Sequence, residues 1–238
     1  YNSISIYALH PLYISTDETG TLNNPERDAF YKTKKEELNQ LPLINYDDVD
    51  YWKWNFFREI FLQEGANVFT SQEFTIFFEE NKEWLIPYAA YSYLRDKYHT
   101  PLFHEWEENS RYNKPNIEKL CSPDSPVYKE ISLYYYLQFH AHQQLKKVRN
   151  YTYTRGVVLK GDIPIGISRA SIEARTETGY FNMHFQEGRP PDDFATLGQN
   201  WGFPTYNWKL MAADNDRWWQ KRFSKLADFF DGSLIAHI

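Results

Sequence analysis

The sequence predicts an α/β fold that contains a separate helical unit. Two short apolar runs, residues 157–159 and 233–238, have the length and composition of buried parallel strands. A long connection and one helical pattern lie between them, so this region has the order strand, loop, helix, strand. Residues 47–122 instead carry apolar stripes at helical spacing, which indicate packed helices.

The composition excludes several classes of partner. The 238-residue chain has 26 basic and 32 acidic side chains, so it offers no strongly basic face for a nucleic acid. No apolar run reaches the length of a membrane span, and Cys121 alone allows no internal disulfide. A single cysteine is typical of a reducing compartment. We therefore expect a cytoplasmic protein without nucleic-acid or membrane partners.

Aromatic residues make up 18% of the chain, including eight Trp and nineteen Tyr. Packing between helices accounts for most aromatic residues in proteins of this kind. The alternative is sugar binding, because the apolar C–H face of a pyranose ring stacks on Trp or Tyr while its hydroxyls bind amides and carboxylates. Composition alone does not separate the two interpretations.

The first segment, residues 1–46, begins with a strand-like run at residues 1–14. A charged stretch at residues 32–37 predicts a solvated helix or loop. An abrupt start in such a strand-like run is unusual for a natural chain terminus. A stop on the core-like strand at residues 233–238 is unusual as well. From them we expect that the chain is truncated.

Three helices are predicted in the helical unit at residues 47–122. The first begins at Asp47 and ends at Gly65. The second has a capping-box pattern formed by Thr70 and Glu73. The third carries Trp84 and further apolar residues along one side. These stripes indicate a core face rather than a ligand site.

Residues 123–238 begin with a long helix. Ser125 supplies the cap and Pro126 the first position, and the apolar stripe continues to about Tyr151. A last helix begins near Asn215. Four apolar residues in and just after this helix are predicted to face inward together. They are Trp219, Phe223, Leu226 and Phe230.

The connection at residues 161–208 is long and irregular, which is typical of a binding or catalytic loop. Asp162 is its strongest candidate for a working carboxylate. It follows the strand at residues 157–159 at the carboxyl end, where (β/α) barrels and open α/β sheets place their sites. A structural aspartate that caps a turn beside Gly161 and Pro164 is an equally good interpretation.

Other candidate chemistry is weaker. His140 and His142 are two residues apart on a helix and point in different directions, whereas a helical zinc pair needs a spacing of three or four. Cys121 has no companion ligand, and the pair Asp192 and Asp193 is typical of a solvated turn. The glycines are too scattered for a nucleotide-binding fingerprint. We predict no metal and no cofactor.

Several motifs resemble one known enzyme family, the amylomaltases or disproportionating enzymes of glycoside hydrolase family 77. They are residues 161–168 (GDIPIGIS), 190–192 (PPD), 198–202 (GQNWG), 204–208 (PTYNW), Trp218 and Trp219 with Arg222, and residues 230–238. The opening run at residues 1–14 is also similar to the family's loop after its second barrel strand. The sequence is most similar to the branch related to the plant cytosolic disproportionating enzyme.

The resemblance implies part of a (β/α)8 TIM barrel, covering about strands 2–4. Residues 1–46 would follow strand 2, and residues 47–122 would be a helical insertion subdomain. Residues 123–238 would hold a barrel helix, strand 3, the substrate loop, a helix and strand 4. The implied activity is that of a 4-α-glucanotransferase, which passes a piece of an α-1,4-glucan or maltooligosaccharide to an acceptor sugar. The implied mechanism is retaining and needs no cofactor.

The family pattern also implies which residues line the donor site. Gln199 would recognise sugar hydroxyls, Trp201 would stack on the sugar, and Asp192 would anchor the loop. The remaining members would be Tyr1, Asp162 and His237.

This sequence departs from the family at its fourth strand, where the signature Tyr-Arg-Ile-Asp-His is replaced by residues 233–237. Ala236 stands in the place of the nucleophilic aspartate and has no oxygen to attack with. Leu234 replaces the arginine expected beside carboxylates such as Asp162. Arg175 and Arg189 stand where the close branch has an aromatic and a small residue. The family's other two catalytic carboxylates belong to later strands.

We therefore predict an amylomaltase-type 4-α-glucanotransferase that is inactive as this chain alone. A catalytically dead α-glucan-binding module is the first alternative. A helical interaction domain, in which only residues 47–151 matter, is the second.

Overall fold

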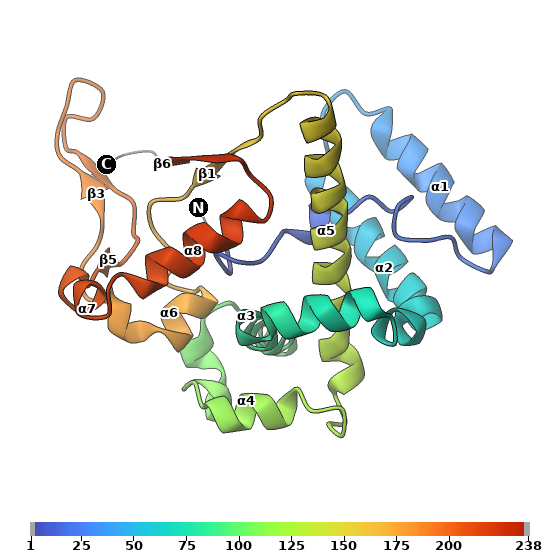
Figure 1. Cartoon of the computed structure of the whole chain (residues 1–238), viewed down its shortest axis with the longest axis horizontal. Coiled ribbons are helices and arrows are strands. Elements are labelled where there is room, and N and C mark those ends of the chain that lie inside the picture. Colours follow the sequence, from blue (N-terminus) through green and yellow to red (C-terminus); the bar gives the residue numbers. More distant parts are fainter. Residues whose placement is uncertain (1–2, 236–238) are drawn as a thin grey trace.

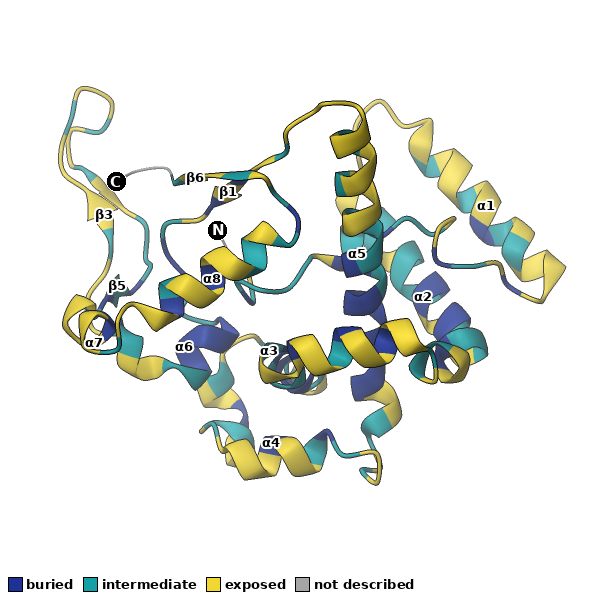
Figure 2. Cartoon of the chain, in the orientation of Figure 1, coloured by how far each residue is buried: buried dark blue, intermediate teal, exposed yellow. Residues whose placement is uncertain are grey.

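Helix α5 (Tyr128–Thr154) is the element around which the other helices pack in the computed structural model, which describes residues 3–235. Its buried side chains contact α3 (Gln72–Tyr98) in one cluster and α2 (Tyr46–Phe69) in another. Figure 1 shows α5 between α1 (Pro25–Asn39) and α2 on one side and the C-terminal elements on the other. Its middle turns are buried (Figure 2).

Shorter elements complete the helical region. Helix α4 (Lys114–Leu120) closes the α3–α5 cluster, in which Trp106 is fully buried. The charged stretch at residues 32–37 belongs to α1, so the helical alternative was the correct one. The 3₁₀ turns of this region are η1 (Pro11–Tyr13), η2 (Phe103–Glu105) and η3 (Glu107–Asn109).

The predicted end of the first helix is wrong. Helix α2 passes through Gly65 and continues to Phe69. Gly65 is buried, and a Cβ atom placed there would lie 2.6 Å from the ring of Phe61. This glycine therefore serves close packing inside the helix rather than its termination.

The start and continuity of α3 also differ from the prediction. Ser71, not Thr70, is the N-cap, because the Ser71 Oγ accepts a hydrogen bond from the Phe74 N–H at 3.2 Å. The predicted second and third helices are one continuous helix that contains Pro87. The long helix α5 begins at Tyr128, two residues after Pro126, and extends to Thr154.

The C-terminal region is built on a parallel pair of strands. Strand β1 (Lys160–Ile163) pairs with β6 (Gly232–Ile235), and the register places Asp162 opposite Leu234. The prediction of a strand at residues 157–159 is wrong, because Val157 and Val158 are 51% and 73% exposed and the ladder begins only at Lys160. The C-terminal strand prediction is confirmed as far as Ile235.

The connection between β1 and β6 has more order than its sequence indicates. Its elements are α6 (Ile172–Thr176), η4 (Thr178–Tyr180), β2 (Phe181–Asn182), β3 (Gly188–Arg189), β4 (Gln199–Asn200), β5 (Thr205–Tyr206), α7 (Trp208–Ala213) and α8 (Arg217–Ala227). Strand β2 pairs with β5, and β3 pairs with β4 to form a hairpin. A third core cluster joins β2 and β5 to α8 and includes Phe181, Tyr206 and Trp218.

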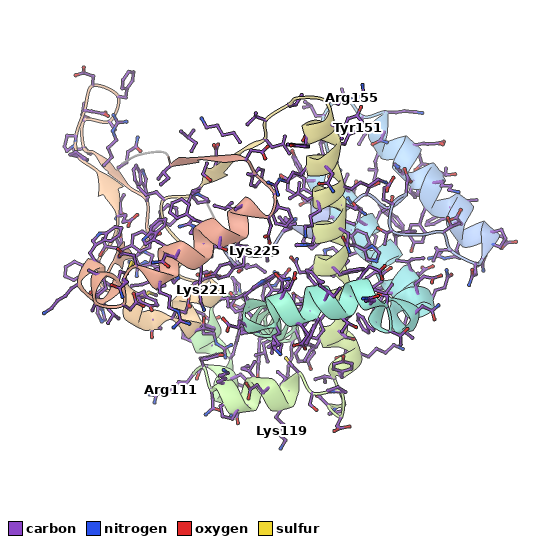
Figure 3. All side chains as sticks on the ribbon, viewed as in Figure 1. Arg111, Lys119, Tyr151, Arg155, Lys221 and Lys225 are labelled. Atoms are coloured by element: carbon purple, nitrogen blue, oxygen red, sulfur yellow. The ribbon has the colours of Figure 1, made fainter. Side chains whose placement is uncertain are left out.

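The predicted inward face of the last helix is partly wrong. Trp218 and Arg222 are the buried side chains of α8, whereas Phe223 is 40% exposed. Lys221 and Lys225 point from α8 toward α3 (Figure 3), where the Lys221 Nζ lies 2.9 Å from a Glu83 carboxylate oxygen. The helical region and α8 are thus joined partly by polar contacts.

We predict that Gly65→Ala lowers the free energy of unfolding. In an ordinary helix the change would be stabilising by about 1 kcal/mol. Here the new methyl group would clash with the ring of Phe61, which is itself packed against Tyr136, so we expect a loss of about 1–3 kcal/mol. Urea denaturation of the wild type and the variant measures it.

The control is the same change in a Phe61→Leu background. With the ring removed, Gly65→Ala should be neutral or stabilising. Equal destabilisation in both backgrounds would contradict the packing argument.

Candidate functional site

Asp162 lies on β1, at the carboxyl end of the parallel strand pair. Its side chain is exposed, while its strand neighbours Gly161 and Ile163 are buried. Paired residues in a parallel ladder project to the same face. Leu234 is therefore the side chain beside Asp162 on β6, and it is 42% exposed. The position beside Asp162 holds an apolar group where a cation would pair with the carboxylate.

The β3–β4 hairpin brings Gln199 and Trp201 together. The Trp201 Nε1–H donates to the Gln199 Oε1 at 2.9 Å, which fixes the indole relative to the amide. The Trp201 backbone N–H donates to the Glu187 carbonyl at 2.9 Å and so ties the returning strand to the outgoing one. An aromatic surface and an amide are thus held together on one hairpin.

Asp192 organises the tip of this hairpin. Its Oδ1 accepts hydrogen bonds from the backbone N–H groups of Phe194 at 2.9 Å and Ala195 at 2.7 Å. Its Oδ2 lies 2.9 Å from the guanidinium of Arg189, which is on β3. The paired carboxylate of Asp192 therefore closes the turn, and Arg189 contributes to the same closure.

The hairpin lies beyond the carboxyl ends of β1 and β6 (Figure 1). Contacts at its base connect it to the turn after Asp162. A Cβ atom placed on Gly166 would be 2.7 Å from the ring of Phe203, and the Arg169 Nε donates to the Gly202 carbonyl at 2.7 Å. Within residues 3–235 no hydrogen bond joins Asp162 to the hairpin directly. Asp162 and the hairpin, the two parts of the predicted site, therefore lie at the same edge of the fold. The contacts at the base of the hairpin link them.

A cavity of about 190 Å³ lies next to Asp162. Glu173 and Arg222 also line it. Larger cavities lie elsewhere, such as one of about 620 Å³ between η1 and α5 lined by Tyr13, Val148 and other residues. We regard the smaller cavity as the relevant one, because it borders the candidate carboxylate.

The remaining predicted site residues, Tyr1, Ala236 and His237, lie outside the residues that the structure describes. Their placement relative to Asp162 stays a prediction.

The weaker candidates have structural explanations. His142 is buried with its ring 5.1 Å from the ring centroids of both Phe77 and Phe229. Burial lowers the pKa values of His140 and His142 to about 4, so both side chains are neutral at pH 7. Burial raises the pKa of the Cys121 thiol to about 11, which leaves it unreactive.

Arg175 is placed away from the hairpin, although the sequence pattern associates it with the loop. Its buried guanidinium donates to the backbone carbonyl of Asn109 and lies 5.0 Å from the ring centroid of Trp106. A second ring, that of Tyr112, is 5.8 Å away. Arg175 therefore connects α6 to the helical region.

Glu173 is a buried carboxylate that sequence reasoning missed. Its Oε1 accepts hydrogen bonds from the Ser5 Oγ at 2.7 Å and the Ile6 N–H at 3.1 Å. Burial raises its pKa to about 7, and the nearby Glu177 carboxylate adds to this shift. No local signal could have found it, because its partners lie near the other end of the chain.

Comparison with known proteins gives a consistent assignment. A sequence model of the 4-alpha-glucanotransferase family, Glyco_hydro_77, matches residues 1–238. The rice 4-alpha-glucanotransferase DPE2 (Oryza sativa subsp. japonica) is 38% identical over 244 residues, covering 100% of this chain and 25% of the rice protein. The 4-alpha-glucanotransferase of Chlamydia muridarum is 30% identical over 239 residues, covering 100% of this chain and 45% of that protein.

The fold is similar to solved structures as well. An amylomaltase from Streptococcus agalactiae in complex with acarbose matches with a TM-score of 0.77 at 20% identity, covering 100% of this chain and 48% of that one. The chain thus spans between a quarter and about half of the length of these proteins. These matches confirm the family resemblance and its plant-like branch. Among the described residues, no helix is both long and apolar enough to cross a membrane.

We predict that Glu173 makes stability depend on pH. Its pKa is about 7 in the folded chain and about 4.5 when exposed, so the folded chain holds a proton that the unfolded chain has lost between these pH values. The stabilisation is therefore complete below about pH 4.5 and is lost as the pH rises through 7. Glu173→Gln should remove this loss, which is on the order of a few kcal/mol. Urea denaturation at several pH values measures it.

The difference between wild type and variant is the informative quantity. His140 and His142, whose lowered pKa values destabilise the fold as the pH falls from 6.5 toward 4, contribute equally to both proteins. Parallel stability–pH curves for the two proteins would contradict the assignment of a buried, protonated Glu173.

Proposed function

Because the chain belongs to the 4-alpha-glucanotransferase family, glycoside hydrolase family 77, we propose that it forms the donor-sugar part of an α-1,4-glucan transferase site. We further propose that this chain alone binds a maltooligosaccharide without transferring it. The observation that carries the proposal is the Gln199–Trp201 pair, in which the Trp201 Nε1–H donates to the Gln199 Oε1 at 2.9 Å. This pair lies on a hairpin beyond the carboxyl ends of β1 and β6.

The chemistry of this pair suits a glucose unit. An indole offers a face for the apolar C–H side of a pyranose, and an amide both donates to and accepts from sugar hydroxyls. Trp201 is partly exposed and Gln199 is exposed, so the pair has a surface to offer. Asp162 would bind hydroxyls of the same sugar from the strand end, and Asp192 would hold the hairpin over it. The roles of Tyr1 and His237 follow from the family pattern.

The parallel pairing of β1 with β6 supports the proposal that the chain forms part of a (β/α)8 barrel. In this proposal β1 and β6 are strands 3 and 4, α5 and α8 are the helices that precede them, and residues 47–122 are the helical insertion. Residues 1–46 then follow strand 2. The similarity in fold to the Streptococcus agalactiae amylomaltase supports this division. The single free cysteine, Cys121, fits a cytoplasmic location.

The residue types at the β6 end argue against transfer by this chain. A retaining mechanism needs a carboxylate that attacks the anomeric carbon about 5 Å from the acid that protonates the leaving oxygen. Ala236 in the nucleophile's place supplies no such oxygen. Leu234 beside Asp162 likewise supplies no positive charge. The alternative, a catalytically dead glucan-binding module, rests on the same observations about Ala236 and Leu234.

We predict that maltoheptaose binds to the hairpin and changes Trp fluorescence. Trp201→Ala should remove the stacking surface and weaken binding about tenfold or more, which corresponds to a loss of at least about 1.4 kcal/mol. Tyr153→Ala, an aromatic that is 78% exposed at the end of α5, is the matched control and should leave the affinity unchanged.

A transfer assay tests the proposal that the chain does not transfer glucan units. Incubation of the chain with maltotriose, followed by chromatography with an active amylomaltase as a positive control, should give no longer or shorter products. Products would show that the chain is active without the expected nucleophile. Equal binding by the wild type and Trp201→Ala would show that the stacking surface is misassigned.

A further inference from the structure

The guanidinium group of Arg169 connects both strands of the hairpin at its base. Its Nε donates to the Gly202 carbonyl at 2.7 Å, and its two terminal nitrogens donate to the carbonyls of Met183 and Phe185. Met183 and Phe185 precede β3, and Gly202 follows β4. One side chain therefore binds the chain where it enters the hairpin and where it leaves.

A second guanidinium holds the turn that follows Asp162. Arg222 is 2% exposed and donates to the Pro164 carbonyl and, at 3.3 Å, to the Tyr206 hydroxyl. That hydroxyl donates in turn to the Ile165 carbonyl at 2.6 Å. The turn between β1 and Arg169 is thus fixed from α8 and β5.

Neither arginine forms an ion pair with a carboxylate in the part of the chain that the structure describes. Both use their donors chiefly on backbone carbonyls. A guanidinium presents its five N–H donors in a fixed planar fork, so it sets the relative positions of the carbonyls it binds. A lysine ammonium at the same place would act as a point charge without this geometry.

The tip of the hairpin adds little apolar packing that could determine its orientation. Strands β3 and β4 contain two residues each, and the hairpin is largely exposed (Figure 2). Phe194 and Leu197 at its tip are 93% and 96% exposed, so they bury almost no apolar surface. Contacts at the base, among them the hydrogen bonds of Arg169 and the packing of Phe203 against Gly166, therefore contribute more to the orientation of the hairpin than its tip does.

We propose that Arg169 is the positioning residue of the glucan site, which sets the Gln199–Trp201 pair at a fixed place relative to Asp162. Arg222 supports it by fixing the turn from which Arg169 extends. This inference rests on the proposed glucan-binding function. Arg169 acts on the sugar only through the hairpin and does not touch it.

Amide hydrogen exchange and maltoheptaose titration of the wild type, Arg169→Lys and Arg169→Met test the proposal. We expect exchange in residues 186–203 to become at least about tenfold faster in both variants, while α3 and α5 keep their protection. The affinity for maltoheptaose should fall about tenfold or more. Arg169→Lys should not restore it, because one ammonium group cannot bind three carbonyls in a fixed arrangement.

The matched control is Arg175→Met. This variant also removes a guanidinium that donates to a backbone carbonyl and stacks on aromatic rings, but at the helical region rather than at the hairpin. It should lower the free energy of unfolding and leave both hairpin exchange and affinity unchanged.

The outcomes distinguish failure of the proposed glucan binding from failure of the positioning role of Arg169. Absence of maltoheptaose binding by the wild type would refute the proposed function, while hydrogen exchange still tests whether Arg169 holds the hairpin. Unchanged exchange in the Arg169 variants, faster exchange without loss of affinity, or full rescue by lysine would each overturn the positioning role.

Discussion

The parallel pairing of β1 with β6 is the constraint on which the candidate site depends. Asp231 fixes the start of the ladder, since its backbone N–H donates to the Leu159 carbonyl at 2.8 Å and its Oδ2 accepts from the Leu159 N–H at 3.0 Å. A shift of one residue would move Asp162 to the buried face. The register thus decides that Asp162 is exposed beside Leu234 and that both strands end toward the hairpin.

Most of the aromatic residues of this chain belong to the core rather than to a binding surface. Trp106, Trp218 and several tyrosines of α3 and α5 are fully buried, and further aromatic side chains pack against the same core clusters. The core interpretation of the composition therefore explains the majority, and Trp201 is the aromatic residue to which we assign the proposed role in binding. A high aromatic content is evidence for sugar binding only where an aromatic side chain is held beside polar groups.

Buried and partly buried ionisable side chains connect segments that are distant in the sequence. Glu173 holds the N-terminal segment through Ser5 and Ile6, Arg175 holds the helical region through Asn109, and Arg169 and Arg222 hold the hairpin and its turn. Such groups are costly to bury unless their hydrogen bonds are satisfied. Here most of the hydrogen bonds that these side chains make go to backbone atoms, which gives directional links between segments. Among the described residues, the Glu173 Oε2 and the Arg175 Nε are buried without a hydrogen-bond partner.

The sequence by itself determined the helical stripes, the order of strand, loop, helix and strand, and the motifs that assign the family. It determined these because spacing and residue type are local properties. Only the tertiary structure decided the rest. The reason for a glycine at position 65 inside α2 is the nearby ring of Phe61. The pairing of β1 with β6 begins at Lys160, next to the hydrogen bonds between Asp231 and Leu159. Arg169 and Arg222 bind carbonyl and hydroxyl groups that distant segments supply. Glu173 is protonated because distant segments bury it. No local sequence pattern records these contacts.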